Sequence, residues 1–232
     1  FMLCPSGTPG AVSRCARRFL RCNSALGFRP LPCHTPSMRH VPIDSKVFTE
    51  NRERLKQLLP PKSLAIVNAN DVLPTNADGS LPLHPNSDLF YLTGIDQPDT
   101  ILVLMPGNQE RKEILFVKPP DPGQEHWTGH LLTKTEATGE SGIATVNTAN
   151  QFEQFLSSIL AGRPFAAQPQ EYESFLKALQ ENKARVQLVL GPAPKLNEKL
   201  SPAYEFADKL KTRYSGFTVS DATPILRSLR QI

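Results

Sequence analysis

The segment ILVLMPGNQERKEILFV, residues 101–117, places two short apolar runs on either side of a polar connection. The runs are 101–105 and 114–117, and apolar runs of this length bounded by turn-forming residues are typical of buried strands. Residues 106–108, Pro-Gly-Asn, open the connection, and Pro and Gly are strong turn signals. The segment therefore predicts two buried strands joined by a short connection.

Similar apolar runs on both sides of this pair predict further strands. Upstream, 63–67 lies between prolines and polar residues, and 90–93 has the same character. An opening helix is expected over 44–59, with residues 51–54 mostly on its outer side. Downstream, strands at 144–146, 186–190 and 217–219 alternate with helices at 134–140, 151–160, 171–182 and 202–213. This alternation predicts an α/β fold in which a mixed β-sheet is flanked by helices on both faces.

The distribution of charge argues against nucleic acid as a partner of the folded part. The chain of 232 residues carries 26 basic and 22 acidic side chains, and residues 1–43 hold six Arg and no acid. Subtracting those six leaves 20 basic against 22 acidic residues in 44–232, a slightly acidic balance. No window approaches the roughly 18 apolar residues of a membrane helix, so we expect a soluble protein with no membrane partner.

The N-terminal residues differ from the rest and are interpreted as lying outside the fold. Residues 1–37 are rich in Pro, Arg and Ser without periodicity, which predicts a disordered or non-native extension. Two origins stay open: upstream sequence translated ahead of a start at Met38, and an Arg-rich targeting segment. All four cysteines lie in the first 33 residues. The folded body is therefore compatible with a reducing compartment, and we expect a cytoplasmic protein.

Three groups of side chains could carry chemistry, and the common nucleotide, zinc-protease and serine-hydrolase motifs are absent. The first group is Glu125, His126 and His130, but Gly129 and nearby prolines argue against the helix that would direct both His to one metal, which favours exposed loop histidines. The second group, Asp88, Asp96 and Asp99, has the neighbours of turn and cap chemistry. The third is Trp127, the single Trp of the chain, which is either a core residue or an aromatic wall for a ligand.

The order of several motifs resembles the N-terminal domain of aminopeptidase P and of the wider creatinase and prolidase family. These motifs are NSDLFYLTG (86–94), QPD (97–99), ILVL (101–104), LFV (115–117) and Glu125-x-Trp127-x-Gly129. The resemblance covers about residues 38–232 and implies a mixed sheet flanked by helices over 38–223. Residues 224–232 resemble the start of the linker to a larger catalytic domain.

In that family the catalytic domain performs the chemistry, with two Asp, one His and two Glu holding a pair of divalent ions, usually manganese. The resemblance therefore implies no catalytic and no metal-binding residue in this chain. It implies instead a parent enzyme, an Xaa-Pro aminopeptidase, that releases the N-terminal residue preceding proline from a peptide. The chain alone is expected to be inactive, and its partners are its own catalytic domain and sister subunits of a homo-oligomer.

Two positions match family residues near the substrate. Asp78 matches an aspartate in a hydrogen-bond network that reaches the catalytic domain, although a turn-forming Asp before Gly79 is an equal interpretation. Trp127 matches a tryptophan that helps to wall the substrate site. One departure is His84-Pro85, where family members often carry Arg-Gln. This difference puts in doubt any polar contact that the loop would make with substrate.

Two other functions stay open beside an aminopeptidase domain. The first is a stand-alone module of the same fold that binds peptides or proteins without peptidase activity. The second is a structural subunit that pairs with a separately encoded catalytic chain. A stretch of coding sequence after Ile232 that contains the Asp, Asp, His, Glu, Glu set would favour the aminopeptidase.

Overall fold

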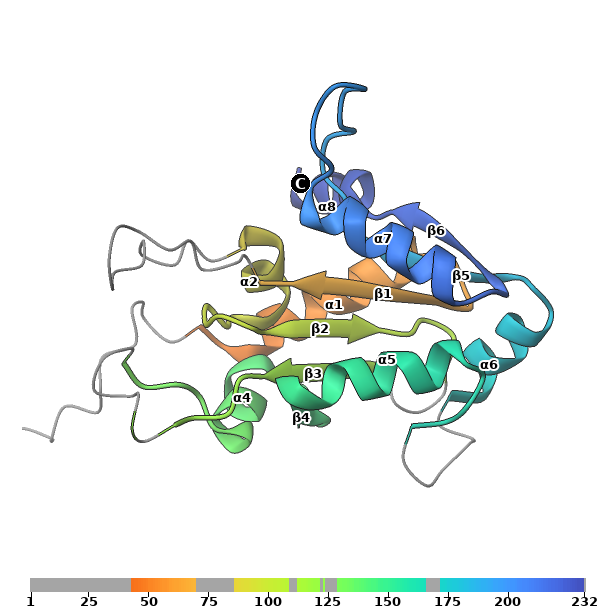
Figure 1. Cartoon of the computed structure of the whole chain (residues 1–232). Helices are drawn as coiled ribbons and strands as arrows, with labels where there is room; N and C mark the ends of the chain where they lie inside the picture. Colours follow the sequence, from red (N-terminus) through yellow and green to blue (C-terminus); the bar gives the residue numbers. More distant parts are fainter. Residues whose placement is uncertain are drawn as a thin grey trace, which may run out of the picture. The chain divides into compact units, whose positions relative to one another are not determined.

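A mixed six-stranded β-sheet forms the centre of the computed structural model (Figure 1), which describes residues 43–69, 86–108, 112–121, 123, 129–165 and 172–231. All of them belong to one compact unit, 41–232. The strand order is β4-β3-β2-β1-β5-β6, and only β2 runs against the other five. The bounds are β1 Ser63–Asn68, β2 Ile101–Leu104, β3 Glu113–Val117, β4 Val146–Thr148, β5 Ala184–Leu188 and β6 Phe217–Asp221.

Helices cover both faces of this sheet, and each face has its own apolar core. The bounds are α1 Ser45–Leu58, α2 Ser87–Thr93, α4 Lys134–Ser141, η1 Ala149–Gln151, α5 Phe152–Leu160, α6 Glu173–Gln180, α7 Pro202–Arg213 and α8 Thr223–Arg230. α5, α6 and α7 pack on one face, and α1, α2, α4 and α8 pack on the other. In Figure 1, α5 and α7 lie in front of the sheet and α1 lies behind it. The predicted α/β fold is confirmed.

Alternating side chains divide β1 between the two cores. Leu64 and Ile66 belong to the core beneath α5, α6 and α7, whereas Ala65 and Val67 belong to the opposite core. Successive side chains of a strand point to opposite faces, so a strand buried on both faces is apolar at every position. This explains why the short, uninterrupted apolar runs of the sequence are strands.

The predicted strand pair of 101–117 is confirmed as β2 and β3. The two strands are antiparallel, with Leu102 opposite Leu115 and Val103 opposite Ile114. All four of these side chains are fully buried. Burial of each contributes about 1.5–3 kcal/mol relative to exposure. The pair therefore contributes to the cores on both faces of the sheet.

The strand predicted at 90–93 is wrong, because these residues form the last turns of α2. The Asn86 side chain accepts hydrogen bonds from the backbone N–H groups of Asp88 and Leu89, which are two of the orphan donors at the start of a helix. Gly94, with a φ of 74°, ends the helix in the left-handed conformation. The two caps, with seven helical residues between them, fix a short helix where the apolar run had predicted a strand.

The outward orientation predicted for residues 51–54 is also wrong in part. Arg52 is completely buried and Asn51 is 6% exposed. Arg52 Nη1 donates to the backbone oxygens of Leu92 at 2.8 Å and Ser141 at 2.9 Å, which lie at the carboxyl ends of α2 and α4. A cation at two helix carboxyl ends is favoured by their unpaired carbonyl groups and their dipoles. The charge is buried because it has these partners.

Candidate functional site

The carboxyl ends of five strands meet at one edge of the sheet, called here the carboxyl edge. β1, β3, β4, β5 and β6 all run in one direction, and β2 begins at the same edge because it runs in the other. Connections that leave this edge include 69–86 after β1 and 118–133 after β3. In open α/β sheets, ligands bind outside the carboxyl ends of strands, so this edge is the candidate site.

The predicted site residues lie in those two connections. Asp78 belongs to the first and Trp127 to the second, and both lie outside the described residues, as do Glu125 and His126. His130 is described: its Nε2 lies 3.3 Å from Glu136 Oε2, and it is partly exposed at the approach to α4. The structure therefore describes the two ends of each connection but not the site candidates between them.

Asn86 holds the two ends of the first connection together. Its Nδ2 donates to the backbone oxygen of Asn68, the last residue of β1, at 2.9 Å. Its Oδ1 simultaneously caps α2 by accepting from Asp88 N at 2.9 Å and from Leu89 N at 3.3 Å. One side chain thus starts the helix and closes residues 69–85 onto the end of a core strand. Asn is suited to this because its amide carries both a donor and an acceptor.

The next two residues of the Asn-Ser-Asp motif contact α8. Arg230 Nη1 donates to Ser87 Oγ at 2.9 Å. Arg230 Nη2 lies 2.9 Å from Asp88 Oδ1, an ion pair without the angle of a hydrogen bond. The Asp88 side chain is 14% exposed, so this pair is partly shielded from water. The contact fastens α8 to the helix that closes the first connection.

Asp96 and Asp99 lie beside β2 at the carboxyl edge, and Asp99 is part of a turn. Asp99 has a φ of 56° and pairs with Lys118, whose Nζ lies 3.0 Å from Asp99 Oδ2. Left-handed backbone is tolerated better by Asp than by most side chains. Between them lies Gln97, which belongs to the QPD motif but was not among the predicted site residues. It contacts the backbone at both ends of the second connection.

The second connection ends at a capping box that opens α4. Thr133 Oγ1 accepts from Glu136 N at 3.3 Å, and the Glu136 carboxylate accepts from Thr133 N at 2.8 Å. The hydrogen bonds from the Thr133 backbone and then from its hydroxyl lower the pKa of Glu136, and His130 lowers it further. The motif Thr-x-x-Glu is a recognised start signal for a helix, so this end of the connection is locally encoded.

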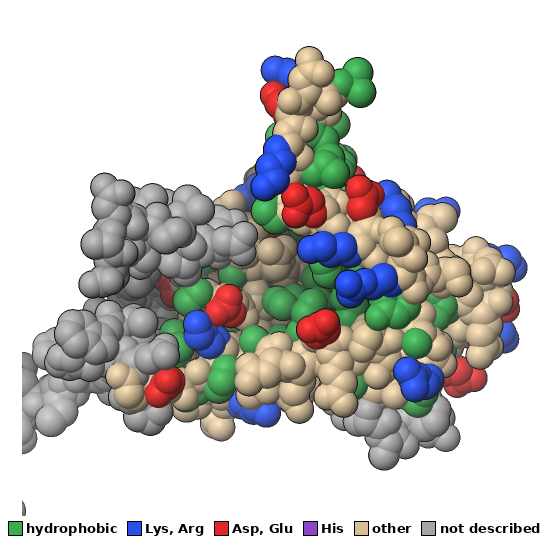
Figure 2. Space-filling view, viewed as in Figure 1, with side chains coloured by type: hydrophobic (Ala, Val, Ile, Leu, Met, Phe, Trp, Pro, Cys, Tyr) green, Lys and Arg blue, Asp and Glu red, His purple; other side chains and the backbone are tan. Residues whose placement is uncertain are grey.

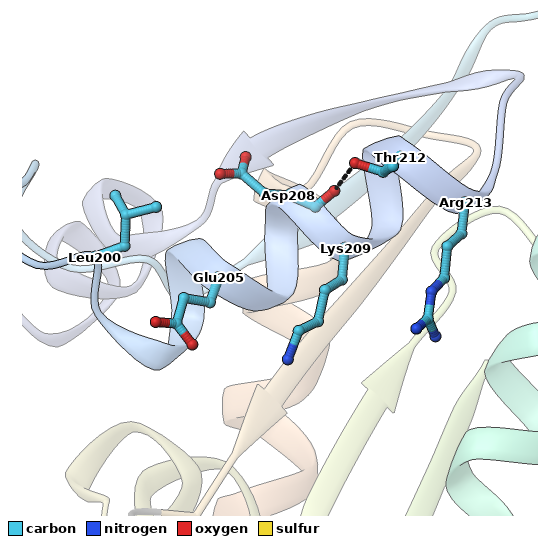
Figure 3. A pocket seen from close by; sticks show the side chains of 6 residues that line it. All are labelled: Leu200, Glu205, Asp208, Lys209, Thr212 and Arg213. Carbon is cyan, nitrogen blue, oxygen red and sulfur yellow. Dashed lines mark hydrogen bonds between the residues drawn. The ribbon is translucent and has the colours of Figure 1, made fainter.

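Two surface hollows lie along α7. Figure 2 shows hydrophobic side chains gathered in a hollow beneath α7, with Lys and Arg side chains at its rim. In Figure 3, Glu205, Lys209 and Arg213 extend from one side of α7 into a cavity of about 350 Å³. A second hollow, of about 680 Å³, lies where α5, α6 and α7 end. Neither hollow is lined by a His or Cys. The charged side chains that line them belong to the exposed face of α7.

The described part of the chain contains no group of three or more His, Cys, Asp or Glu side chains that could hold a metal ion. The candidate pair at His126 and His130 has only one member among the described residues. Within those residues, no helix has the length and apolar character needed to cross a membrane. The polar groups described above at the carboxyl edge are side-chain amides, hydroxyls and the charged groups of ion pairs.

Residues 48–166, just over half of the chain, match the family model described as the N-terminal domain of aminopeptidase P. The Xaa-Pro aminopeptidase of Haemophilus influenzae is 29% identical over 118 residues, which make up 51% of this chain and 27% of that protein. This chain therefore spans about a quarter of the length of that curated relative.

Solved structures show the same architecture. A Bacillus anthracis protein assigned as an aminopeptidase P superposes with a TM-score of 0.66 at 30% identity, over 81% of this chain and 40% of that one. Zinc-substituted Escherichia coli aminopeptidase P in complex with product superposes with a TM-score of 0.58 over 80% of this chain and 38% of that one. The identity in the second case is 20%, so that likeness is one of fold.

Proposed function

The chain belongs to the family of aminopeptidase P N-terminal domains, and on this basis we propose that it is the non-catalytic N-terminal domain of a manganese-dependent Xaa-Pro aminopeptidase. Such an enzyme removes the N-terminal residue that precedes proline in a peptide. The proposed role of this domain is to shape the substrate site and to support assembly with sister subunits. The domain spans 38–223, residues 1–37 lie outside it, and 224–232 lead toward a catalytic domain.

One observation carries the proposed role in the substrate site. The connections that contain Asp78 and Trp127 leave the ends of β1 and β3, and these two strands end at the same edge of one sheet. An aromatic side chain and a carboxylate brought to one edge could together contact a peptide, through apolar packing and through hydrogen bonds. We therefore propose that Trp127 walls the bound peptide and that Asp78 joins the hydrogen-bond network behind it.

The metal ions of the proposed enzyme do not fit the described residues of this domain, which bring no three ligating side chains together. The proposal assigns them to the catalytic domain, where a pair of divalent ions would supply an activated hydroxide. No step of that reaction is assigned to a residue of this chain. The chain alone, with manganese added, is expected to leave an Xaa-Pro peptide uncleaved.

The proposed partners are a peptide with proline at its second position, the catalytic domain and sister subunits. The slightly acidic balance of 44–232 supports the exclusion of nucleic acid. The absence of cysteine after Cys33 is compatible with the reducing cytoplasm, which is the proposed compartment. The proposal includes no membrane partner.

The first experiment reads the coding sequence downstream of Ile232 and assays its product. An open frame that supplies the Asp, Asp, His, Glu, Glu set, and a protein that cleaves Xaa-Pro peptides with manganese, would support the proposal. Cleavage by the purified 232-residue chain would contradict it. A stop codon directly after Ile232 would favour a stand-alone binding module.

The second experiment tests the two site residues in the longer protein. Trp127→Ala is expected to raise KM for an Xaa-Pro peptide by about tenfold, because an aromatic contact is lost, while Trp127→Phe retains most of it. Asp78→Asn should also impair turnover. Asp208→Asn is its matched control, because Asp208 is exposed on α7 and its Oδ1 lies 3.7 Å from Lys211 Nζ in a surface ion pair. Unchanged kinetics in both site variants would remove this domain from the substrate site.

A further inference from the structure

Gln97 is a buried amide that contacts both ends of the segment containing Trp127. Its side chain lies in the turn before β2, and the residue is 7% exposed. Nε2 donates to the backbone oxygen of Lys118 at 3.4 Å, directly after β3. Oε1 accepts from the backbone N–H of Leu132 at 2.9 Å, shortly before α4. Between these two contacts lie residues 119–131.

The chemistry of the two partners fixes the orientation of this amide. The Lys118 carbonyl can only accept and the Leu132 N–H can only donate, so the Gln97 nitrogen must face Lys118 and its oxygen must face Leu132. A buried amide without partners lowers the stability of the fold, because it has lost its hydrogen bonds to water and gained none in the protein. Both the nitrogen and the oxygen of this side chain therefore make a hydrogen bond, and the two bonds go to opposite ends of the same connection.

The positions of Gln97 and of its two partners are each set by the fold. On one side, the Asp99 carboxylate pairs with the Lys118 ammonium at 3.0 Å, so the turn contacts Lys118 through both backbone and side chain. On the other side, Leu132 is preceded by the buried Leu131 and followed by Thr133, the cap of α4. The amide therefore joins two anchored points and restricts the path of the chain between them.

We propose that Gln97 is a positioning residue that holds the two ends of the connection containing Trp127, at Lys118 and Leu132, at the carboxyl edge of the sheet. It acts through the backbone of Lys118 and Leu132 and is assigned no contact with substrate. Its effect on peptide binding rests on the proposed function, in which Trp127 walls the peptide. Its effect on the segment itself does not, and the two can be measured separately.

The test uses the 232-residue chain, in which Trp127 is the single Trp and reports on its own segment by fluorescence. Gln97→Ala removes the hydrogen bonds to Lys118 and Leu132. The equilibrium ratio of chains in which these two ends are detached from the turn to chains in which they are attached is expected to rise by roughly thirtyfold. Amide hydrogen exchange at Leu132 should accelerate by about that factor. Acrylamide should quench Trp127 more strongly, while the helix content seen by circular dichroism stays unchanged.

Two further variants sharpen the result. Gln97→Glu keeps an acceptor for Leu132 N–H and loses the donor to Lys118, so Leu132 should stay protected while Trp127 quenching rises partway. Gln97→Glu also serves if Gln97→Ala fails to fold. Asp99→Asn is the matched control, because it removes only the exposed pair with Lys118 and keeps a residue that tolerates left-handed backbone. It should change both readouts far less than Gln97→Ala does, because loss of an exposed ion pair shifts such an equilibrium by at most about fivefold, or about 1 kcal/mol.

The outcomes separate this inference from the proposed function. Wild-type exchange at Leu132 and wild-type Trp127 quenching in a folded Gln97→Ala chain would overturn the positioning role. If the segment is released in Gln97→Ala but KM for an Xaa-Pro peptide is unchanged in the longer protein, the positioning role stands and Trp127 is not a wall of the site. If the segment is released and KM rises with little change in kcat, both are supported.

Discussion

Arg52 Nε lies 2.9 Å from Glu113 Oε2, and this ion pair joins α1 to the first residue of β3. Arg52 is fully buried, and the Glu113 side chain is 15% exposed. The other Glu113 oxygen lies 2.8 Å from Lys56 Nζ. Burial lowers the pKa of Arg52, and the Glu113 carboxylate opposes this by stabilising the charged form. The guanidinium keeps its charge near neutral pH because its ordinary pKa is so high.

Arg52→Met is expected to destabilise the fold by about 3–5 kcal/mol, the usual cost of removing one partner of a buried ion pair. The change leaves the backbone oxygens of Leu92 and Ser141 without this donor and leaves Glu113 with Lys56 alone. Urea denaturation measures the free energy of unfolding. The control is Arg54→Met on the exposed side of α1, which should change it by less than about 0.5 kcal/mol. Equal effects of the two variants would show that burial of Arg52 contributes nothing.

Gly94→Ala is expected to destabilise the protein more than Gly162→Ala, although both glycines have nearly equal φ values of 74° and 75°. The strain of left-handed backbone is therefore shared, at about 1–2 kcal/mol. A Cβ at Gly94 would overlap the Phe48 ring of α1, whereas a Cβ at Gly162 would meet nothing within 4 Å. The overlap should add about 1–3 kcal/mol, measured as the difference between the two variants in urea. A difference near zero would mean that Phe48 moves aside freely.

Arg230→Gln is expected to lower the free energy of unfolding by about 1 kcal/mol through loss of the contacts with Ser87 and Asp88. A double-mutant cycle with Asp88→Asn measures the coupling energy, which should fall as salt is added because Arg230 is 35% exposed. Arg227→Gln, an exposed position on the same helix, is the matched control. Zero coupling at low salt would mean that α8 is held by its apolar side chains alone.

The Glu136 carboxyl is expected to titrate below its ordinary value of 4.5, because hydrogen bonds from Thr133 favour the charged form. Its stabilising effect is therefore complete above the unfolded-state pKa and is lost as the pH falls through the lower folded-state pKa. In Thr133→Ala, a carboxyl titration followed by NMR should show the pKa moving back toward 4.5. Thr138→Ala, which alters a hydroxyl bonded to Lys134 on the same helix, should leave the titration unchanged.

Local patterns predicted most of the elements because each depends on nearby residues. α7 occupies 202–213 as expected, since Pro202 opens it and the chain leaves it before Gly216. The strand expected at 144–146 begins two residues later, as β4 Val146–Thr148, and 90–93 is helical. In the second case the aromatic residues favour a strand when taken alone, but the cap side chain and the terminal glycine on either side favour a helix.

The candidate site divides in the same way. The order of the motifs alone was enough to indicate the family, the sheet and the residues Asp78 and Trp127 as site candidates. Packing in three dimensions assigned roles to Asn86, Gln97, Arg230 and Arg52 through long-range contacts, in which the partner lies between 18 and 143 positions away along the chain. A side-chain hydrogen bond to a distant backbone group leaves no periodic trace in the sequence. It exists only once the strands and helices that carry its two ends have packed together.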